Sequence, residues 1–188
     1  CKAVADSIGG TLMKDEDLLE EVNYIVEYPT AFYGEFDESY LSLPKEAIIT
    51  PMKEHQRYFP VLGADGKLLN KFITVRNGDS YAIDNVKRGN EKVLDARLSD
   101  ALFFYHEDTK KPLEAYVERL DTIVFQQKLG TILDKTKRIQ NLSEKIAKAL
   151  ALTLPNLDRA AYLSKADLTT AMVFEFTELQ GIMGRYYA

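Results

Sequence analysis

The chain is poor in the residues that cross-link small folds or bind metal ions. Its 188 residues include one Cys, two His and no Trp. A single Cys cannot form a disulfide within the chain, which agrees with the reducing cytoplasm where we expect the protein to be. No run approaches the roughly eighteen apolar residues of a membrane span, and no basic and then apolar leader opens the chain. We therefore expect neither a membrane partner nor a signal peptide.

Motifs of catalysis are also missing. The sequence has no Gly-rich phosphate loop, no Cys-x-x-Cys and no Gly-x-Ser-x-Gly. Cys1 stands at the terminus without a partner that could orient it. Glu175 and Glu178 share a face of an expected helix, where carboxylates usually form caps or salt bridges. We expect no catalytic residue, no metal ligand and no cofactor in this chain.

The composition is that of a soluble globular protein, with 46% hydrophobic and 28% charged residues. The net charge of −5 is unevenly distributed. Residues 1–46 carry three Lys or Arg against eleven Asp or Glu, residues 47–90 carry seven against four, and residues 128–148 carry six against two. Local field, more than net charge, steers a nucleic acid. The two basic zones permit RNA binding, although a solvated helix face explains residues 128–148 equally well.

The patterning predicts an α+β chain in two parts. Residues 1–100 are expected to be a mixed α/β part, with strands near 31–36, 57–62 and 71–76 and an Asp-Gly turn before the last of them. Residues 101–188 are expected to be all-helical.

Helix boundaries follow from capping residues and breakers. Asp15 or Asp17 can cap a helix through Tyr28, and Pro51 is expected to interrupt a short helix that Pro44 opens. A helix over 131–151 is expected to turn its apolar residues inward and its cations outward. The residues expected inward are Ile132, Leu133, Ile139, Leu142, Ile146, Ala149 and Leu150, and those expected outward are Lys135, Lys137, Arg138, Lys145 and Lys148. Residues 168–187 are expected to form one buried helix, in which Gly181 and Gly184 permit close packing.

Residues 52–60 concentrate cations and aromatics ahead of a strand. Lys53 and Arg57 are four residues apart and share a helix face, with Glu54 and His55 turned away. Cations beside aromatic rings suit phosphates and unstacked bases. The alternative is that Tyr58 and Phe59 belong to the core and that the polar residues are an ordinary solvated helix end. Arg76, at a strand end beside a Gly turn, is a ligand contact or a strand-end salt bridge.

The same stretch carries a family resemblance. The resemblance rests on this stretch and on further blocks along the chain. The blocks are Met52-Lys53-Glu54-His55-Gln56-Arg57-Tyr58-Phe59-Pro60-Val61, Val26-Glu27-Tyr28-Pro29-Thr30, Val75-Arg76-Asn77-Gly78, Gly89-Asn90-Glu91-Lys92-Val93-Leu94, Ala96-Arg97-Leu98-Ser99-Asp100-Ala101, Phe125-Gln126-Gln127-Lys128-Leu129-Gly130-Thr131 and Val173-Phe174-Glu175-Phe176-Thr177-Glu178-Leu179-Gln180-Gly181. These blocks resemble, in order and spacing, the beta subunit of bacterial heterotetrameric glycyl-tRNA synthetase. Such beta subunits are several times longer, so the resemblance implies an internal piece of a longer chain.

The resemblance implies a fold and partners. The first part is expected to be the second half of an editing-type domain like that of the phenylalanyl-tRNA synthetase beta subunit, and the second part the start of a degenerate HD-like domain. The expected partners are the alpha subunit, glycine tRNA and a second beta subunit. The alpha subunit is expected to carry the class II active site and to use ATP and Mg.

The resemblance also implies tRNA binding, for which the basic zones supply candidates. We expect phosphate contacts, and stacking by Tyr58, from Lys53, His55, Gln56, Arg57, Tyr58, Arg76, Lys92, Arg97, Lys135, Lys137 and Arg138.

Three alternatives stay open. An HD-type metal-dependent phosphohydrolase needs spaced His and Asp ligands, but the chain has only His55 and His106, and Lys165-Ala166-Asp167 stands where a His-Asp pair is expected. Asp167 can instead cap a helix or pair with Lys165 or Arg185. A pure protein-protein scaffold would use helices 15–28 and 168–187. Post-transfer editing is a further, weaker possibility.

Overall fold

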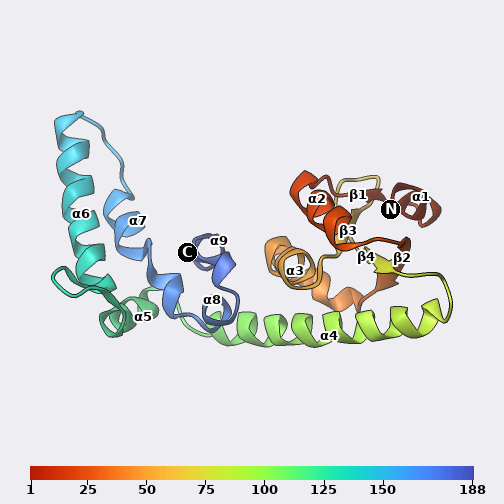
Figure 1. Ribbon diagram of the computed structural model, residues 1–188. Coiled ribbons are helices and arrows are strands. Elements are labelled where there is room, and N and C mark those ends of the chain that lie inside the picture. The colour runs from red at the N-terminus through yellow and green to blue at the C-terminus, as the bar shows by residue number, and fades with distance from the viewer. The chain divides into compact units, whose positions relative to one another are not determined.

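The computed structural model describes residues 1–188 and shows a mixed α and β chain. It divides into two compact units, Cys1–Phe103 and Phe104–Ala188. The helix α4 (Ile83–Asp108) contributes residues to both units. Figure 1 shows its position in the ribbon, and each unit is described by itself.

The first unit is organised around a four-stranded antiparallel sheet. Its strands are β1 (Thr11–Leu12), β2 (Pro29–Glu35), β3 (Phe59–Leu62) and β4 (Leu68–Asn77), in the order β1-β3-β4-β2 (Figure 1). The turn between β3 and β4 has Gly66 at φ 75°, and Asp65 Oδ1 accepts a bond of 3.0 Å from the Lys67 amide. The expected hairpin with an Asp-Gly turn is confirmed.

Helices α1 (Lys2–Ser7) and α2 (Glu16–Ile25) precede the long strands. Asp15 caps α2, because its Oδ1 accepts a bond of 2.9 Å from the Leu18 amide. The helix ends at Ile25 and not at Tyr28 as expected. Pro29 disfavours helical backbone at Tyr28, whose amide instead donates to Asn77 Oδ1 at 3.0 Å.

Pro51 does not break the chain as expected. After the 3₁₀ turn η1 (Glu38–Ser42), helix α3 (Lys45–Thr50) continues directly into a single π turn, η2 (Pro51–His55). Pro51 itself is helical, with φ −58° and ψ −36°. A proline removes one helix hydrogen bond and crowds the preceding turn, and a wider π turn accommodates both effects. Residues 52–55 are therefore held in a helical turn and not in a loop.

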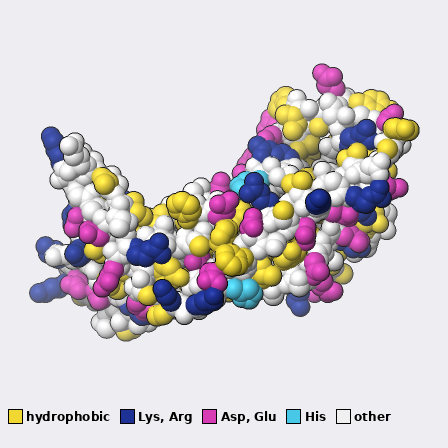
Figure 2. All heavy atoms as spheres, turned by 90° about the horizontal axis from the view of Figure 1, so that it is seen from below, with side chains coloured by type: hydrophobic (Ala, Val, Ile, Leu, Met, Phe, Trp, Pro, Cys, Tyr) yellow, Lys and Arg dark blue, Asp and Glu magenta, His cyan; other side chains and the backbone are white.

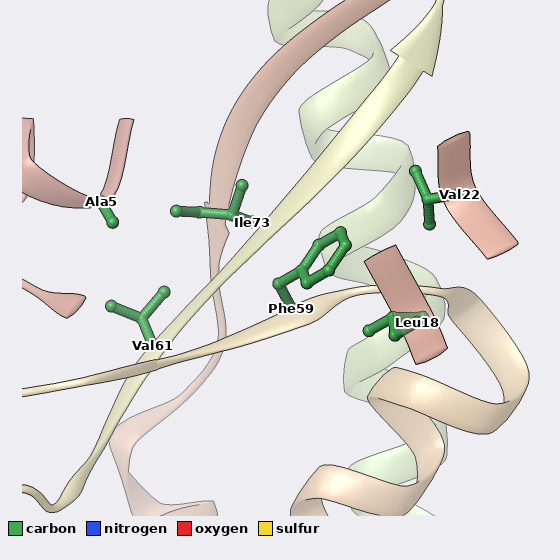
Figure 3. Packing of buried hydrophobic residues seen from close by; sticks show 6 residues of the cluster. All are labelled: Ala5, Leu18, Val22, Phe59, Val61 and Ile73. Carbon is green, nitrogen blue, oxygen red and sulfur yellow. The ribbon is translucent and has the colours of Figure 1, made fainter. Parts of the chain in front are cut away.

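The sheet has a core on each face at the start of β3. Figure 3 shows Phe59, Val61 and Ile73 pointing toward Ala5 of α1 and toward Leu18 and Val22 of α2. Successive strand residues point to opposite faces, so the neighbouring Tyr58 lies on the other side. Its ring stacks on Phe72, with centroids 4.5 Å apart and planes 13° apart. Tyr58 and Phe59 are both core residues.

The part of α4 in the first unit is joined to the sheet by polar contacts. Glu91 accepts a bond of 2.9 Å from the Glu35 amide, and the Tyr40 hydroxyl donates to Asp95 at 3.0 Å. Lys87 Nζ lies 4.1 Å from the centroid of the Tyr33 ring. These contacts fix one face of α4 against β2 and η1.

The second unit is mainly helical, with one small β-hairpin. Its elements are α5 (Glu114–Val117), η3 (Glu118–Thr122), β5 (Val124–Gln126), β6 (Gly130–Thr131), α6 (Ile132–Ala149), α7 (Leu157–Leu163), η4 (Ala166–Thr169), α8 (Ala171–Glu175), η5 (Thr177–Leu179) and α9 (Ile182–Tyr187). Helices α6 and α7 lie side by side (Figure 1). The β5-β6 hairpin differs from the all-helical expectation, because Gly130, at φ 81°, reverses the chain ahead of α6.

Residues 168–187 do not form one helix, as was expected, but a series of short helical turns. Thr170 caps α8, and Gly181, at φ 79°, precedes α9. Gly184 permits the close approach that was expected of it, because an added Cβ would lie 3.1 Å from Asp167 Oδ2. The apolar composition reports burial correctly, but it does not distinguish one long helix from several short ones.

Two buried aspartates cap these short helices from a distance. Asp108 accepts bonds from the Ala171 and Met172 amides, at 2.8 and 2.9 Å, and from the Tyr187 hydroxyl at 3.1 Å. Asp167 accepts from the Gly181 and Gly184 amides at 2.5 and 3.2 Å. Unpaired amides at helix N-termini favour a carboxylate. Asp167 therefore acts as a helix cap, one of the roles expected for it.

Asp108→Ala is expected to destabilise the fold by about 2–4 kcal/mol, because it leaves two amides and a buried hydroxyl without an acceptor. Asp100→Ala, which removes an exposed carboxylate from the same helix, is the matched control and should change little. Chemical denaturation of both variants measures the difference. Equal stabilities would contradict the capping role.

The glycines give a second stability test. A Cβ at Gly34 would lie 2.3 Å from Phe72 Cζ, whereas a Cβ at Gly89 of α4 meets no heavy atom within 4 Å. Gly34→Ala is expected to cost about 1–3 kcal/mol by overpacking, and Gly89→Ala to stabilise by up to about 1 kcal/mol through helix propensity. Thermal unfolding of the two variants should shift in opposite directions. A shift of the same sign would refute this packing account.

Candidate nucleic-acid interface

The cations of residues 52–60 are engaged by acids of α2. Lys53 Nζ forms an ion pair with Asp15, and the two side chains are 26% and 13% exposed. Arg57, at φ 56°, donates from Nε to Glu21 Oε1 at 2.7 Å and from its guanidinium to the Glu54 carbonyl. Lys53 and Arg57 both reach α2, where each forms an ion pair with an acid.

The ion pair with Lys53 also affects the pKa of Asp15. Burial raises the pKa of the Asp15 carboxyl, but the hydrogen bond from Lys53 and the Leu18 amide lower it, and the net pKa lies below the usual 3.8. Such a carboxylate stabilises the folded state at neutral pH.

Of the other polar residues of the stretch, Glu54 is exposed, whereas His55, Gln56 and Tyr58 are partly or fully buried. His55 is half-buried and has an interaction partner within the chain. The Gln56 amide oxygen lies 3.5 Å from the Tyr58 hydroxyl. Tyr58 is 3% exposed, and burial raises its pKa to about 12. The expected stacking of Tyr58 on a base is wrong for this structure, because Phe72 covers its ring.

Three candidates of the first unit lie on β4 and α4. The Arg76 guanidinium donates to the Tyr81 carbonyl at 2.6 Å, so it braces the turn after β4 and forms no salt bridge there. Arg97 is half-buried and has a partner within the chain. Lys92 is exposed on α4. Of the three, Lys92 presents its charge to solvent.

Helix α6 carries the densest group of solvent-facing cations. It begins with a capping box, in which the Asp134 amide donates to Thr131 Oγ1 at 3.2 Å and the Thr131 amide donates to Asp134 Oδ2 at 2.9 Å. The Thr131 amide and hydroxyl, and then Lys137 and Arg138, lower the pKa of the Asp134 carboxyl. This cap fixes where the basic helix starts.

The candidates of α6 are fixed by contacts that leave their charges unpaired. Lys135 Nζ lies 4.0 Å from the centroid of the Phe125 ring in β5. Arg138 donates to the Leu129 carbonyl at 2.9 Å, and Lys137 is exposed. Lys145, which is also exposed, lines a shallow hollow of about 540 Å³ together with Lys137 and Arg138. Residue Lys145 was not selected from the sequence, although it lies in the same basic zone.

An apolar row lies beside these cations, contrary to expectation. Leu142, Ile146 and Leu150 were expected inward but are 58%, 49% and 63% exposed. The buried residues of α6 are Thr136 and Ala147, and Ile132 and Leu133, which were also expected inward, do pack against the core of the unit. The spacing of four marks one face of the helix, but it does not show which face packs on a neighbour.

Charge on the visible face of the molecule is interspersed. In Figure 2, Lys and Arg side chains alternate with Asp and Glu, and no single field of one sign covers this face. Within the chain, no group of three or more His, Cys, Asp or Glu side chains could hold a metal ion. None of the helices is both long enough and apolar enough to cross a membrane.

Comparison with known protein families identifies the family of the chain. The model of the family described as glycyl-tRNA synthetase beta subunit matches residues 1–188. The chain belongs to this family.

Curated relatives agree with the family match. The glycine–tRNA ligase beta subunit of Clostridioides difficile (strain 630) is 67% identical over 190 residues, which is 100% of this chain and 28% of the relative. The subunits of the same name from Moorella thermoacetica and Bacillus subtilis (strain 168) are 56% and 58% identical, over 98% and 93% of this chain and 27% and 26% of theirs. The chain thus spans about a quarter of the length of these relatives.

The Lys53 ion pair makes a testable prediction. Lys53→Ala is expected to raise the pKa of Asp15 and to lower stability at neutral pH by about 0.5–1 kcal/mol. Because the pKa of Asp15 is depressed on folding, this contribution is present above its unfolded pKa and disappears as pH falls through the folded pKa, below 3.8. NMR titration of the Asp15 carboxyl and denaturation at several pH values measure both effects.

Lys14→Ala is the control for this prediction, because the Lys14–Glu16 pair is exposed, at 84% and 70%. It should leave the Asp15 titration unchanged. An unaltered Asp15 pKa in the Lys53 variant would show that Lys53 is not its partner in solution.

Proposed function

We propose that the chain is part of the beta subunit of a heterotetrameric glycine–tRNA ligase and that it contributes tRNA binding and subunit assembly to the ATP-dependent attachment of glycine to its tRNA. The observation that carries the proposal is the family match over residues 1–188. The names of the relatives, all glycine–tRNA ligase beta subunits, support it.

Helix α6 supplies the RNA contacts in this proposal. Lys137, Arg138 and Lys145 present adjacent charges at a shallow hollow. Cations that form no ion pair within the protein can displace counterions from phosphates, which is the main source of affinity for RNA. Lys135 and the exposed Lys92 remain further candidates, while Lys53 and Arg57 hold the π turn to α2. Phosphate contacts position the RNA without reading its sequence.

The chemistry of glycine activation belongs to the alpha subunit in this proposal. That partner binds ATP and Mg, and this chain holds no cofactor of its own. A second beta subunit completes the assembly, which acts in the cytoplasm. The first unit serves as part of an editing-type domain, and the second as the start of an HD-like domain. No observation favours the phosphohydrolase, the pure scaffold or residual editing over tRNA binding.

A triple variant tests the RNA contacts. Lys137→Ala, Arg138→Ala and Lys145→Ala together are expected to weaken binding of glycine tRNA about 10–100-fold at low salt and to reduce the slope of log affinity against log salt by about 2–3, since each lost phosphate contact removes about 0.7–0.9. Fluorescence anisotropy with labelled tRNA measures both quantities.

The control removes charges that lie elsewhere. Lys14→Ala with Lys67→Ala deletes two cations whose side chains are each 84% exposed, and it should change the affinity by less than about threefold. If the triple variant binds as tightly as the control, α6 is not the RNA-binding face. A charge-preserving Lys137→Arg with Lys145→Arg should retain binding.

A further inference from the structure

The second unit contains a hollow of about 650 Å³ that lies apart from the basic face of α6. It is formed by the end of α4, the connection from α4 to α5, and residues of α5, η3, η4 and α8. This volume is in the range of pockets that bind small molecules. None of the residues selected from the sequence for RNA binding lines it.

The floor of the hollow is closed by hydrogen bonds within the protein. The Tyr116 hydroxyl donates to the Asp108 carbonyl at 3.1 Å, and Thr169 Oγ1 donates to the Tyr116 carbonyl at 2.8 Å. The Asp108 carboxylate is held by the α8 amides. No buried side-chain polar atom of the chain lacks a partner. The floor is therefore preformed, and its buried polar groups are already hydrogen-bonded without a ligand.

The rim combines an exposed aromatic ring with cations. Phe174 of α8 is 83% exposed, and Phe104 of α4 lines the same hollow. Lys110 is paired with Glu107, and Glu175 has an interaction partner within the chain. Lys111 and Arg119 are exposed, and neither side chain forms an ion pair. The rim of the hollow thus combines two aromatic rings with two cations that form no ion pair.

We propose that this hollow binds a single unpaired nucleotide, with its base against Phe174 and its phosphate held by Lys111 and Arg119. An aromatic face and a nearby cation are the two elements with which proteins hold unstacked nucleotides. A purely apolar ligand would leave both cations unused, and a free phosphate would leave Phe174 exposed. The hollow is large enough for a base and a ribose phosphate together.

The nucleotide can come from two sources with the same chemistry, a free mononucleotide or an unpaired residue of an RNA. The second source rests on the proposed function, because it makes the hollow a contact for an exposed nucleotide of the bound tRNA. The first source does not depend on it. Binding by the hollow can thus be tested separately from the phosphate contacts of α6.

Titration of the isotope-labelled chain followed by NMR tests the proposal, with AMP, adenosine, inorganic phosphate and a single-stranded hexaribonucleotide as probes. We expect AMP or the hexaribonucleotide to shift the amides of residues 168–175 and 110–119, and to bind more tightly than adenosine or phosphate. Saturation by AMP would identify a free nucleotide as sufficient. Saturation by the hexaribonucleotide alone would identify RNA as the source.

Variants at the rim decide whether the hollow is responsible. Phe174→Ser is expected to weaken binding about tenfold or more, through loss of stacking. Lys111→Ala with Arg119→Ala is expected to weaken binding of AMP, which carries a phosphate, more than binding of adenosine, which carries none. Tyr24→Ser removes an aromatic side chain that is 78% exposed elsewhere and serves as the control. Since Phe174 and Lys111 are exposed, these variants should fold.

Two results would overturn the inference. One is the absence of any shift with AMP and with the hexaribonucleotide, and the other is binding that Phe174→Ser and the double cation variant leave unchanged. Failure of the proposed function looks different. In that case the α6 triple variant would bind tRNA normally, whatever the behaviour of the Phe174 variant.

Discussion

Burial of Met52, Tyr58 and Phe59 dictates how residues 51–59 present their polar side chains. The three apolar residues occupy core positions on the two sides of the sheet, so the π turn before them has one allowed orientation. In that orientation Lys53 and Arg57 face α2, whose acids neutralise them. The cations of residues 52–60 are thereby committed to the fold, and a charge that binds a polyanion has to come from another element.

Helix α6 is that element, because its Lys137, Arg138 and Lys145 side chains are exposed and form no ion pair. Thr136 and Ala147 are buried and Ile132 and Leu133 pack on the core, so the long cationic side chains remain outside. In the same unit, short helices are held by carboxylates at a distance, Asp108 for α8 and Asp167 for α9. A unit built from such short pieces depends on polar contacts between segments far apart in sequence. The contacts of Asp108 also help to close the floor of the hollow that Phe174 lines.

Elements with local signals were predictable from the sequence, and contacts between distant residues were not. The Asp15 cap and the β3-β4 hairpin follow from capping and turn residues next to each other. The π turn after Pro51 was missed, since a proline usually ends a helix. The exposure of Leu142, Ile146 and Leu150 was missed because periodicity marks a face without naming its neighbour. The basic character of α6 was visible as a charge excess, whereas the pairing of Lys53 with Asp15 joins residues 38 positions apart in the sequence.

Amide hydrogen exchange of the chain with and without glycine tRNA tests the central claim most directly. The account predicts that tRNA slows exchange in α6, around residues 135–148, and leaves α2 and residues 51–57 unchanged, because the cations there are paired within the protein. Protection of residues 51–57 with none in α6 would contradict the account. That result would show that tRNA binds at residues 51–57, whose side chains the account assigns to the fold.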